Sequence, residues 1–119
     1  MKLDMELVRG ILFQVEDCAE RNGLREAVIE SALQDVLDYH VVYCVQSGLI
    51  EGARLFTNGR RTYMFLNLTP AGHEFVTEAR NDTLWNAAKD QIRQKGLPAT
   101  IDVIKTVLGG LIKNAIGLN

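Results

Sequence analysis

Apolar residues recur at spacings of three and four along most of this chain, which is the period of one face of an α-helix. Five stretches combine that pattern with a preceding capping residue, and three of them are followed by a glycine. We therefore predict five helices. They begin after Asp4, Ser31, Thr69, Asn81 or Asp82, and Thr100, and run to about residues 22, 47, 79, 95 and 115.

Each predicted helix carries an apolar stripe that requires a partner surface. In the second helix the expected core positions are Leu33, Leu37, Val41, Cys44 and Val45. The last helix has the widest stripe, made of Ile101, Ile104, Val107, Leu108, Leu111, Ile112 and Ala115. Gly109-Gly110 interrupts it and permits a kink or a close backbone contact.

Two segments show strand patterns instead. Residues 26–30 are short and β-branched in the middle, which predicts a brief strand that pairs with a hairpin further along. The hairpin turns at Asn58-Gly59, because a two-residue type I′ turn needs positive φ at both central positions. Such a loop would pair Thr57 with Arg60 and Phe56 with Arg61. One face of the hairpin would then carry Arg54, Phe56, Arg61, Tyr63 and Phe65.

The order of helix, short strand, helix and two-stranded wing predicts an α+β, winged-helix-like domain with a helical C-terminal extension. We divide the chain into a core at 1–80 and an extension at 81–119 that packs on the core to give one compact domain. One feature departs from the DNA-reading pattern. No turn signal interrupts residues 31–47, so the helix that usually supports the recognition helix is missing or reduced to one turn.

Composition indicates a folded protein, since 47% of the 119 residues are hydrophobic and 24% are charged. The 2 cysteines lie within helical patterns, and no secretory leader precedes them, so we expect reduced thiols and a cytoplasmic location. Every apolar stretch long enough to span a bilayer contains charged residues, which argues against a membrane protein. A membrane-surface role for the last helix is a minor alternative.

Net charge is −2, which is unusual for a protein that gains its affinity by neutralising phosphates. The charge is unevenly distributed. Residues 1–48 carry four basic and nine acidic side chains, whereas residues 49–119 carry nine basic and six acidic ones. A phosphate-facing surface must therefore come from the second half.

Six segments of the chain form a recognisable series: 2–9, 39–40, 48–52, 68–75 (Leu-Thr-Pro-Ala-Gly-His-Glu-Phe), 80–86 and 100–105. Taken in this order they resemble a family of bacterial and phage proteins, the domain-of-unknown-function family numbered 2513. The resemblance covers nearly the whole chain. It implies a winged-helix-like core and a frequent prophage setting, and it implies no activity and no catalytic residues.

His40 and Cys44 are four residues apart on one helix face and could supply two metal ligands, with Cys18 or His73 completing a set. No paired metal-ligand motif occurs elsewhere, and isolated cysteines at core spacing are usually small buried hydrophobes. We therefore predict no metal or cofactor. His40 and His73 are expected to join the middle helix to the helix after the hairpin through buried hydrogen bonds.

Catalysis has little support in the sequence, because nucleophile motifs and phosphate-binding glycine loops are absent. Asp35 and Asp38 are three residues apart, but they fit the solvated face of a helix better than a catalytic carboxylate pair. We predict a non-enzymatic protein.

The arginines of the wing, Arg54, Arg60 and Arg61, are the candidate nucleic-acid contacts, because guanidinium groups interleaved with aromatic rings bind phosphates and stack on bases. The alternative, which we favour, is that the C-terminal helices cover most of this face. DNA binding by a winged-helix regulator is thus a possible but not the preferred function.

The middle helix favours protein association over DNA binding. Its expected exposed residues include two carboxylates and no lysine or arginine, which would repel a duplex. Tyr39, Val42 and Tyr43 form an apolar patch typical of a protein interface. We predict an accessory protein that acts by protein association, with a second copy in a dimer as the first candidate partner, through this patch or through the last helix, and another protein as the second.

Overall fold

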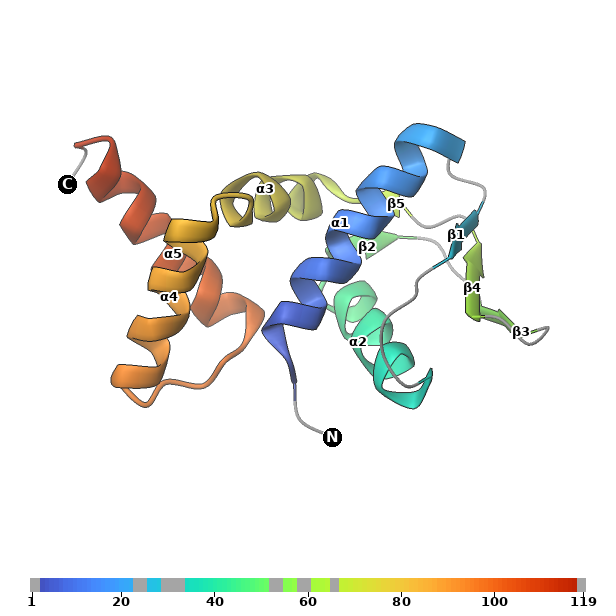
Figure 1. Ribbon diagram of the computed structural model, residues 1–119, viewed down its shortest axis with the longest axis horizontal. Coiled ribbons are helices and arrows are strands. Elements are labelled where there is room, and N and C mark those ends of the chain that lie inside the picture. Colours follow the sequence, from blue (N-terminus) through green and yellow to red (C-terminus); the bar gives the residue numbers. More distant parts are fainter. Residues whose placement is uncertain are drawn as a thin grey trace. The chain divides into compact units, whose positions relative to one another are not determined.

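A computed structural model of the chain describes the backbone of residues 3–22, 26–28, 34–51, 55–57, 61–64 and 67–117, and the side chains of residues 3–17, 36–51 and 67–117. Over the described residues the protein is mostly helical, with five helices and two small antiparallel sheets (Figure 1). The helices are α1 (Met5–Asn22), α2 (Gln34–Gln46), α3 (Pro70–Ala79), α4 (Asp82–Gln94) and α5 (Ile101–Ala115). The strands are β1 (Glu26–Val28), β2 (Ile50–Glu51), β3 (Leu55–Thr57), β4 (Arg61–Met64) and β5 (Asn67–Leu68).

The chain divides into two compact units, residues 1–73 and residues 74–119. The division falls inside α3, a few residues before the boundary that the sequence suggested at residues 80 and 81. That the C-terminal extension packs on the core stays a prediction.

Helix α1 begins where the sequence predicted it, because the Asp4 carboxylate caps its first turn. Asp4 Oδ1 accepts the backbone N–H of Glu6 at 2.9 Å and that of Leu7 at 3.3 Å. The buried positions of α1 recur every three or four residues, as the stripe required. They are Met5, Val8, Ile11, Leu12 and Val15.

Helix α2 ends in the left-handed glycine that the sequence predicted, at Gly48 with φ 78°. The Gly48 N–H donates to the Val45 carbonyl at 3.0 Å, and the Leu49 N–H donates to the Cys44 carbonyl at 3.0 Å, which is the Schellman pattern. The predicted N-cap, Ser31, and the question of a short supporting helix before it lie outside the described residues.

The three-stranded sheet has the order β1-β4-β3, so the brief first strand does pair with the hairpin, as expected. The predicted register of the hairpin is wrong. Thr57 pairs with Arg61 and Phe56 with Thr62, one residue away from the expected pairing. Strand β3 ends at Thr57 and β4 begins at Arg61, and Phe56 is not paired with Arg61. The side chains of both strands lie outside those described.

A second sheet, which the sequence analysis missed, pairs β2 with β5 and leads into α3. Ile50 lies opposite Leu68, and both are buried. Thr69 follows β5 and caps α3 as predicted, since its Oγ1 accepts the Gly72 N–H at 3.0 Å. The same hydroxyl donates to the Gly48 carbonyl at 2.6 Å, and the Thr69 N–H donates to the Leu49 carbonyl at 3.0 Å. The start of α3 is thereby joined to the end of α2.

Gly72 is required at this junction because backbone occupies the space of its missing side chain. A Cβ at this position would overlap the Leu49 carbonyl oxygen and lie 3.1 Å from the Leu49 carbonyl carbon. The Leu-Thr-Pro-Ala-Gly segment thus has a packing explanation: Thr69 and Gly72 allow α3 to start directly against the residues after α2.

The second unit contains the helical hairpin of α4 and α5, whose caps the sequence predicted. Asn81 accepts the Leu84 N–H at 3.0 Å, and Thr100 accepts the Val103 N–H at 3.3 Å. Between the two helices, Gly96 has φ 65° and the Leu97 N–H donates to the Ile92 carbonyl at 3.0 Å. The core side chains of this unit are Phe75, Val76, Ala79, Trp85, Ala88, Ile92, Ile101, Ile104 and Leu108.

Helix α5 runs unbroken through Gly109-Gly110, and no described atom lies within 4 Å of a Cβ placed on either glycine. The two residues therefore make no close backbone contact of the kind that the sequence allowed. The apolar stripe is buried only at Ile101, Ile104 and Leu108, and it is progressively exposed towards the end of the helix.

Candidate functional site

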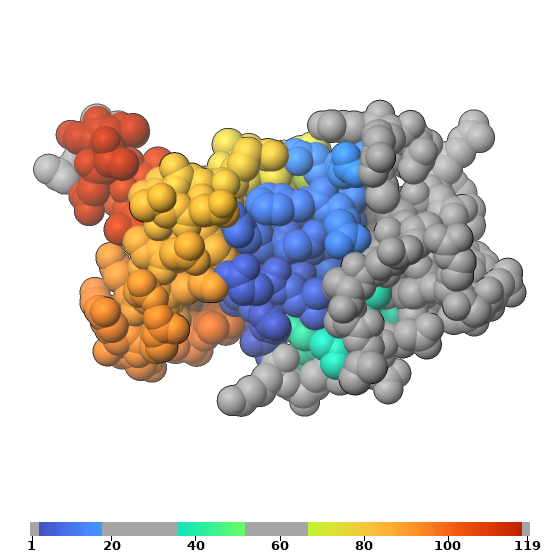
Figure 2. Space-filling view, in the orientation of Figure 1, coloured from blue at the N-terminus to red at the C-terminus, as the bar shows by residue number. Residues whose placement is uncertain are grey.

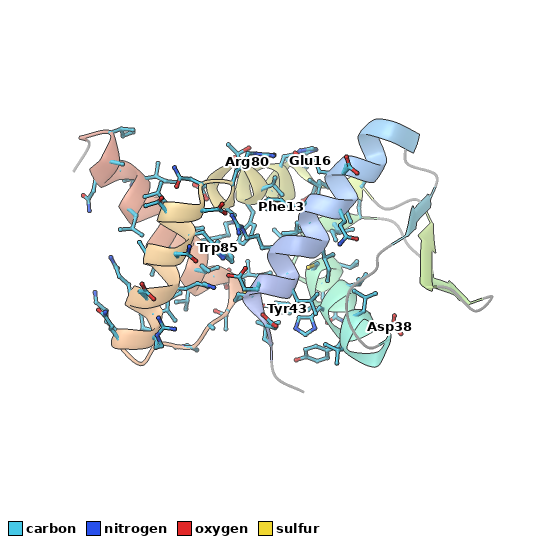
Figure 3. The ribbon with its side chains drawn as sticks, viewed as in Figure 1. Phe13, Glu16, Asp38, Tyr43, Arg80 and Trp85 are labelled. Carbon is cyan, nitrogen blue, oxygen red and sulfur yellow. The ribbon has the colours of Figure 1, made fainter. Side chains whose placement is uncertain are left out.

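The most distinctive surface of the described residues lies on α2. Tyr39 is 41% exposed, Val42 is 51% exposed and Val45 is 36% exposed, and Tyr43 is half-buried beside them. Figure 3 shows Tyr43 and Asp38 on this helix. We call these four side chains, Tyr39, Val42, Tyr43 and Val45, the α2 surface. An exposed cluster of tyrosine and valine departs from the usual scattering of single apolar residues over a protein surface.

Val45 corrects the sequence analysis, which placed it in the core. The buried side of α2 consists of Leu37, His40, Val41 and Cys44, and Val45 falls at its edge. The helix ends one residue later, at Gln46, so no further helical turn continues the buried stripe beyond Val45. Helical spacing alone does not distinguish an edge position from a core position.

The buried face of α2 holds this surface in place through His40, which is fully buried. Its Nε2 accepts the backbone N–H of Asp4 at 2.8 Å, and its Nδ1 lies 2.7 Å from the carbonyl oxygen of Val36. Because Nε2 accepts a hydrogen bond, Nδ1 must be the nitrogen that carries the hydrogen, and it donates to the Val36 carbonyl. The ring therefore connects α2 to the first turn of α1, and the described residues of these two helices adjoin in Figure 2.

The predicted partnership of His40 with His73 is wrong. Both ring nitrogens of His40 are already engaged, and His73 is exposed. The hydrogen bonds of His40 run to the start of α1 and to its own helix, so the sequence identified a structural histidine and misplaced its partner.

His40 and Cys44, the candidate metal ligands, are both buried side chains in the core of the first unit. Cys44 is completely buried, and burial raises the pKa of its thiol from 9.0 to about 12. Both ring nitrogens of His40 are engaged in hydrogen bonds, so its imidazole offers no free lone pair to a metal. Within the described residues no group of three or more His, Cys, Asp or Glu side chains is placed to hold a metal ion. The side chain of Cys18 is not among those described.

Of the three arginines predicted for the wing, the structure describes only the backbone of Arg61. Arg61 is the first residue of β4, but its side chain lies outside the described set, and Arg54 and Arg60 lie outside the described residues altogether. Their predicted role in nucleic-acid contact stays a prediction. Elsewhere, the exposed cation Arg93 forms an ion pair with Asp90 three residues earlier on α4.

A second exposed apolar region lies at the end of α5. Leu111 and Ile112 are half-buried and Ile116 is 64% exposed.

The side chains of Phe75 and Trp85 meet edge to face in the core of the same unit, with ring centroids 6.1 Å apart. No helix among the described residues has the length and apolarity needed to cross a membrane.

Comparison with known proteins shows the family to which the sequence of this chain is related. Residues 2–98 match the family described as "Hypothetical protein (DUF2513)". A protein of Haemophilus influenzae (strain ATCC 51907 / DSM 11121 / KW20 / Rd), called "Uncharacterized protein", is 31% identical over 117 residues, which cover 98% of this chain and 99% of that protein. No solved structure matches the chain.

Proposed function

The chain belongs to the DUF2513 family, and from its α2 surface we propose that it is a non-enzymatic accessory protein that acts by associating with other proteins in a bacterial or prophage setting. The carrying observation is the exposure of Tyr39, Val42 and Val45 on one helix. Tyrosine is enriched at the energetically dominant positions of protein interfaces, where a rigid ring buries a large area at low entropic cost.

We further propose that the first unit is winged-helix-like. Three findings support this topology: the order α1, β1, α2, β2, β3, β4; the antiparallel pairing of β1 with β4; and the antiparallel pairing of β3 with β4 after α2. In such a fold α2 occupies the place of the recognition helix. Here that helix presents apolar side chains, which supports recognition of protein over DNA.

Site-specific photo-cross-linking tests the proposal. A benzophenone side chain at position 39 should give discrete protein adducts in host cells, identified by mass spectrometry, because this position lies within the α2 surface. The same probe at position 86, an exposed residue of α4, provides the matched control. Absence of position-39 adducts, or the same adducts from both positions, would contradict a protein contact at α2.

Self-association, expected from the sequence, is proposed here for the end of α5 instead of the α2 surface. Two facing copies of α2 would bring together helices that each carry Asp35 and Asp38 and no lysine or arginine. The end of α5 carries a single charged side chain, Lys113, in its last turn, and its apolar residue Ile116 is 64% exposed and follows the half-buried Ile112.

Sedimentation velocity over a wide concentration range tests this contact. The wild type should form a reversible dimer that Ile116→Lys weakens, whereas Leu97→Lys, at a residue 42% exposed in the same unit, should leave it unchanged. A wild type that remains monomeric at the highest concentration would exclude self-association, and it would leave the cross-linking result at position 39 unaffected.

A DNA-binding regulator is the second candidate, favoured by one observation: the β3–β4 hairpin is anchored to β1 in a three-stranded sheet, as in a DNA-contacting wing. Under this proposal Arg60→Ala with Arg61→Ala should weaken binding to genomic DNA fragments at low salt and flatten its salt dependence. Lys95→Ala with Lys113→Ala removes the same charge from exposed positions elsewhere and is the control. No binding by the wild type at low salt would rule this candidate out.

A further inference from the structure

Among the side chains that the structure describes as buried, only that of His40 belongs to a type that changes charge between about pH 5 and pH 8. The chain has 2 histidines, and the other one, His73, is exposed. An imidazole in water takes up a proton at about pH 6.5. At position 40 the protonated ring would be a buried charge, which is costly unless a charged partner accompanies it.

The two hydrogen bonds of the His40 ring both belong to its neutral form. Nε2 accepts the Asp4 N–H at 2.8 Å, and Nδ1 donates to the Val36 carbonyl at 2.7 Å. Both partners are uncharged backbone groups, so neither supplies a negative charge to a protonated ring. A proton on Nε2 would place two N–H groups against each other, because imidazolium donates from both nitrogens and accepts at neither. The bond between α2 and the capping residue of α1 would then be lost.

The carboxylate of Asp4 is itself engaged at the start of α1. Its Oδ1 accepts the backbone N–H groups of Glu6 and Leu7. The N-terminal end of a helix carries a partial positive charge, which disfavours a second positive charge on a ring bonded to the same residue. The cap of α1 and the neutral form of His40 therefore support each other.

The other titratable groups of α2, of the first turns of α1 and of β2 leave the ring bonded to backbone alone. The carboxylates among them are Glu6, Asp38 and Glu51, the cation is Arg9, which lies over the ring of Phe13, and the groups that stay uncharged between about pH 5 and pH 8 are Tyr39, Tyr43 and Cys44. Burial raises the pKa of the Cys44 thiol to about 12, so it keeps its proton over this range.

We propose that His40 is an acid-sensitive lock between α1 and α2. In its neutral form the ring holds Asp4, and with it the start of α1, against α2. Uptake of a proton at Nε2 breaks this bond and releases the first turn of α1. The release is local, because a helix end opens at a lower free energy than the helix interior, and the next turns of α1 are held by the buried Val8 and Ile11.

The lock also reaches the α2 surface. Tyr39 lies edge to face on the His40 ring, with ring centroids 5.2 Å apart and an interplanar angle of 74°. A change in the charge or position of the His40 ring therefore acts directly on one of the four side chains of that surface. The lock itself concerns the first unit alone and does not depend on the proposed protein association.

Mild acid should destabilise the first unit for this reason. The unfolded chain takes up a proton on the imidazole of His40 at about pH 6.5, whereas the locked state keeps the ring neutral. Because the unfolded state binds more protons, the stability that His40 contributes is complete above about pH 6.5 and is lost as pH falls below it. One proton is involved, so the folding equilibrium constant should fall by up to about tenfold per pH unit.

NMR spectroscopy of the full-length wild type between about pH 8 and pH 5 tests the lock. The amide signals of Asp4, Glu6 and Leu7 should change together with the ring signals of His40, in one transition below about pH 6.5. The indole signal of Trp85, which is buried in the second unit, should stay in place and shows that the change is local. Titration of the His40 ring with a constant Asp4 amide signal, or no change in either down to about pH 5, would overturn the proposal.

Asp4→Asn separates the ring from the carboxylate beside it. Asparagine caps a helix as well as aspartate does, and the backbone N–H that bonds to His40 remains. This variant should therefore keep the acid transition of the Asp4 to Leu7 amides. Loss of the transition would assign it to the Asp4 carboxylate and would reject the lock.

His40→Gln and His73→Gln are a matched pair, because each removes one of the 2 imidazoles of the chain. In urea unfolding at about pH 7 and pH 5, the wild type and His73→Gln should lose stability in acid to the same extent, by up to about tenfold in the folding equilibrium constant per pH unit. His40→Gln, whose amide oxygen can still accept the Asp4 N–H, should lack this loss. Equal pH dependence of the wild type and His40→Gln would contradict the lock, and if His40→Gln does not fold, the wild-type NMR titration decides.

Discussion

Gly72→Ala should destabilise the protein, although alanine is the better helix former. In an open helical position, alanine in place of glycine stabilises by about 1 kcal/mol. At residue 72 the new Cβ would overlap the Leu49 carbonyl oxygen, which is backbone and cannot rotate away. The first turn of α3 would have to move from the segment after α2, lengthening two hydrogen bonds: the one from the Thr69 N–H to the Leu49 carbonyl and the one from Thr69 Oγ1 to the Gly48 carbonyl.

The size of the effect follows from these contacts. Each hydrogen bond contributes about 1 kcal/mol, and overpacking of a filled site costs about 1–3 kcal/mol. After the helix-forming advantage of alanine is deducted, the free energy of unfolding should fall by about 2–4 kcal/mol. Gly10→Ala is the matched control, because residue 10 is also inside a helix of the first unit and no described atom lies within 4 Å of its Cβ position.

Urea unfolding followed by circular dichroism measures both variants, with the midpoint and the slope compared against wild type. We expect opposite signs: a loss for Gly72→Ala and a gain of up to about 1 kcal/mol for Gly10→Ala. If Gly72→Ala were neutral or stabilising, the close approach of α3 to Leu49 would be wrong, and with it the packing explanation of the Leu-Thr-Pro-Ala-Gly segment.

Three further substitutions test single contacts. Thr69→Val removes the hydroxyl that both caps α3 and donates to the residue after α2, and it should cost about 1–2 kcal/mol in urea unfolding, whereas Thr69→Ser should restore most of that stability. His40→Phe keeps the volume of the ring but leaves the Asp4 N–H without its acceptor, and we expect a loss of about 1–2 kcal/mol, with a smaller loss contradicting the assigned bond. In a Cys18→Ser background, Cys44 should react with a thiol reagent only after unfolding. Burial raises the pKa of the Cys44 thiol in the folded state from 9.0 to about 12. Between these pH values the unfolded state releases a proton that the folded state keeps. The contribution of the buried Cys44 thiol to stability is therefore complete below pH 9.0 and falls as pH rises towards 12. A wild type and a Cys44→Ala variant with identical pH dependence in this range would contradict that burial.

The candidate site was only partly predictable from the chain. Tyr39 and Val42 were expected to be exposed because they fall opposite the Leu37 and Val41 stripe, and both are. Val45 was assigned to the core because it continues that stripe by spacing, yet it is 36% exposed. The local sequence does not show which neighbouring element covers the end of a helix, so the exposure of Val45 could be assigned only from the tertiary structure.

The sequence by itself determined where four of the helices begin and where two of them end. Asp4, Thr69, Asn81 and Thr100 all cap the helices predicted for them, and Gly48 and Gly96 take the left-handed conformation that ends two of them. These signals are readable because a cap bonds to the backbone two or three residues away, and a positive φ is a property of one residue. The brief strand β1 and its pairing with the hairpin were inferred by the same local reasoning.

Only the tertiary structure decided the contacts between distant residues. The hairpin register differs by one residue from the type I′ expectation, β2 pairs with β5, and Gly72 lies against Leu49. His40 bonds to Asp4, 36 residues earlier, and not to His73. Which distant residues come into contact depends on which surfaces pack together when the chain folds. Hydrophobic burial drives this packing, but it is not directional, so the local sequence does not specify the partners.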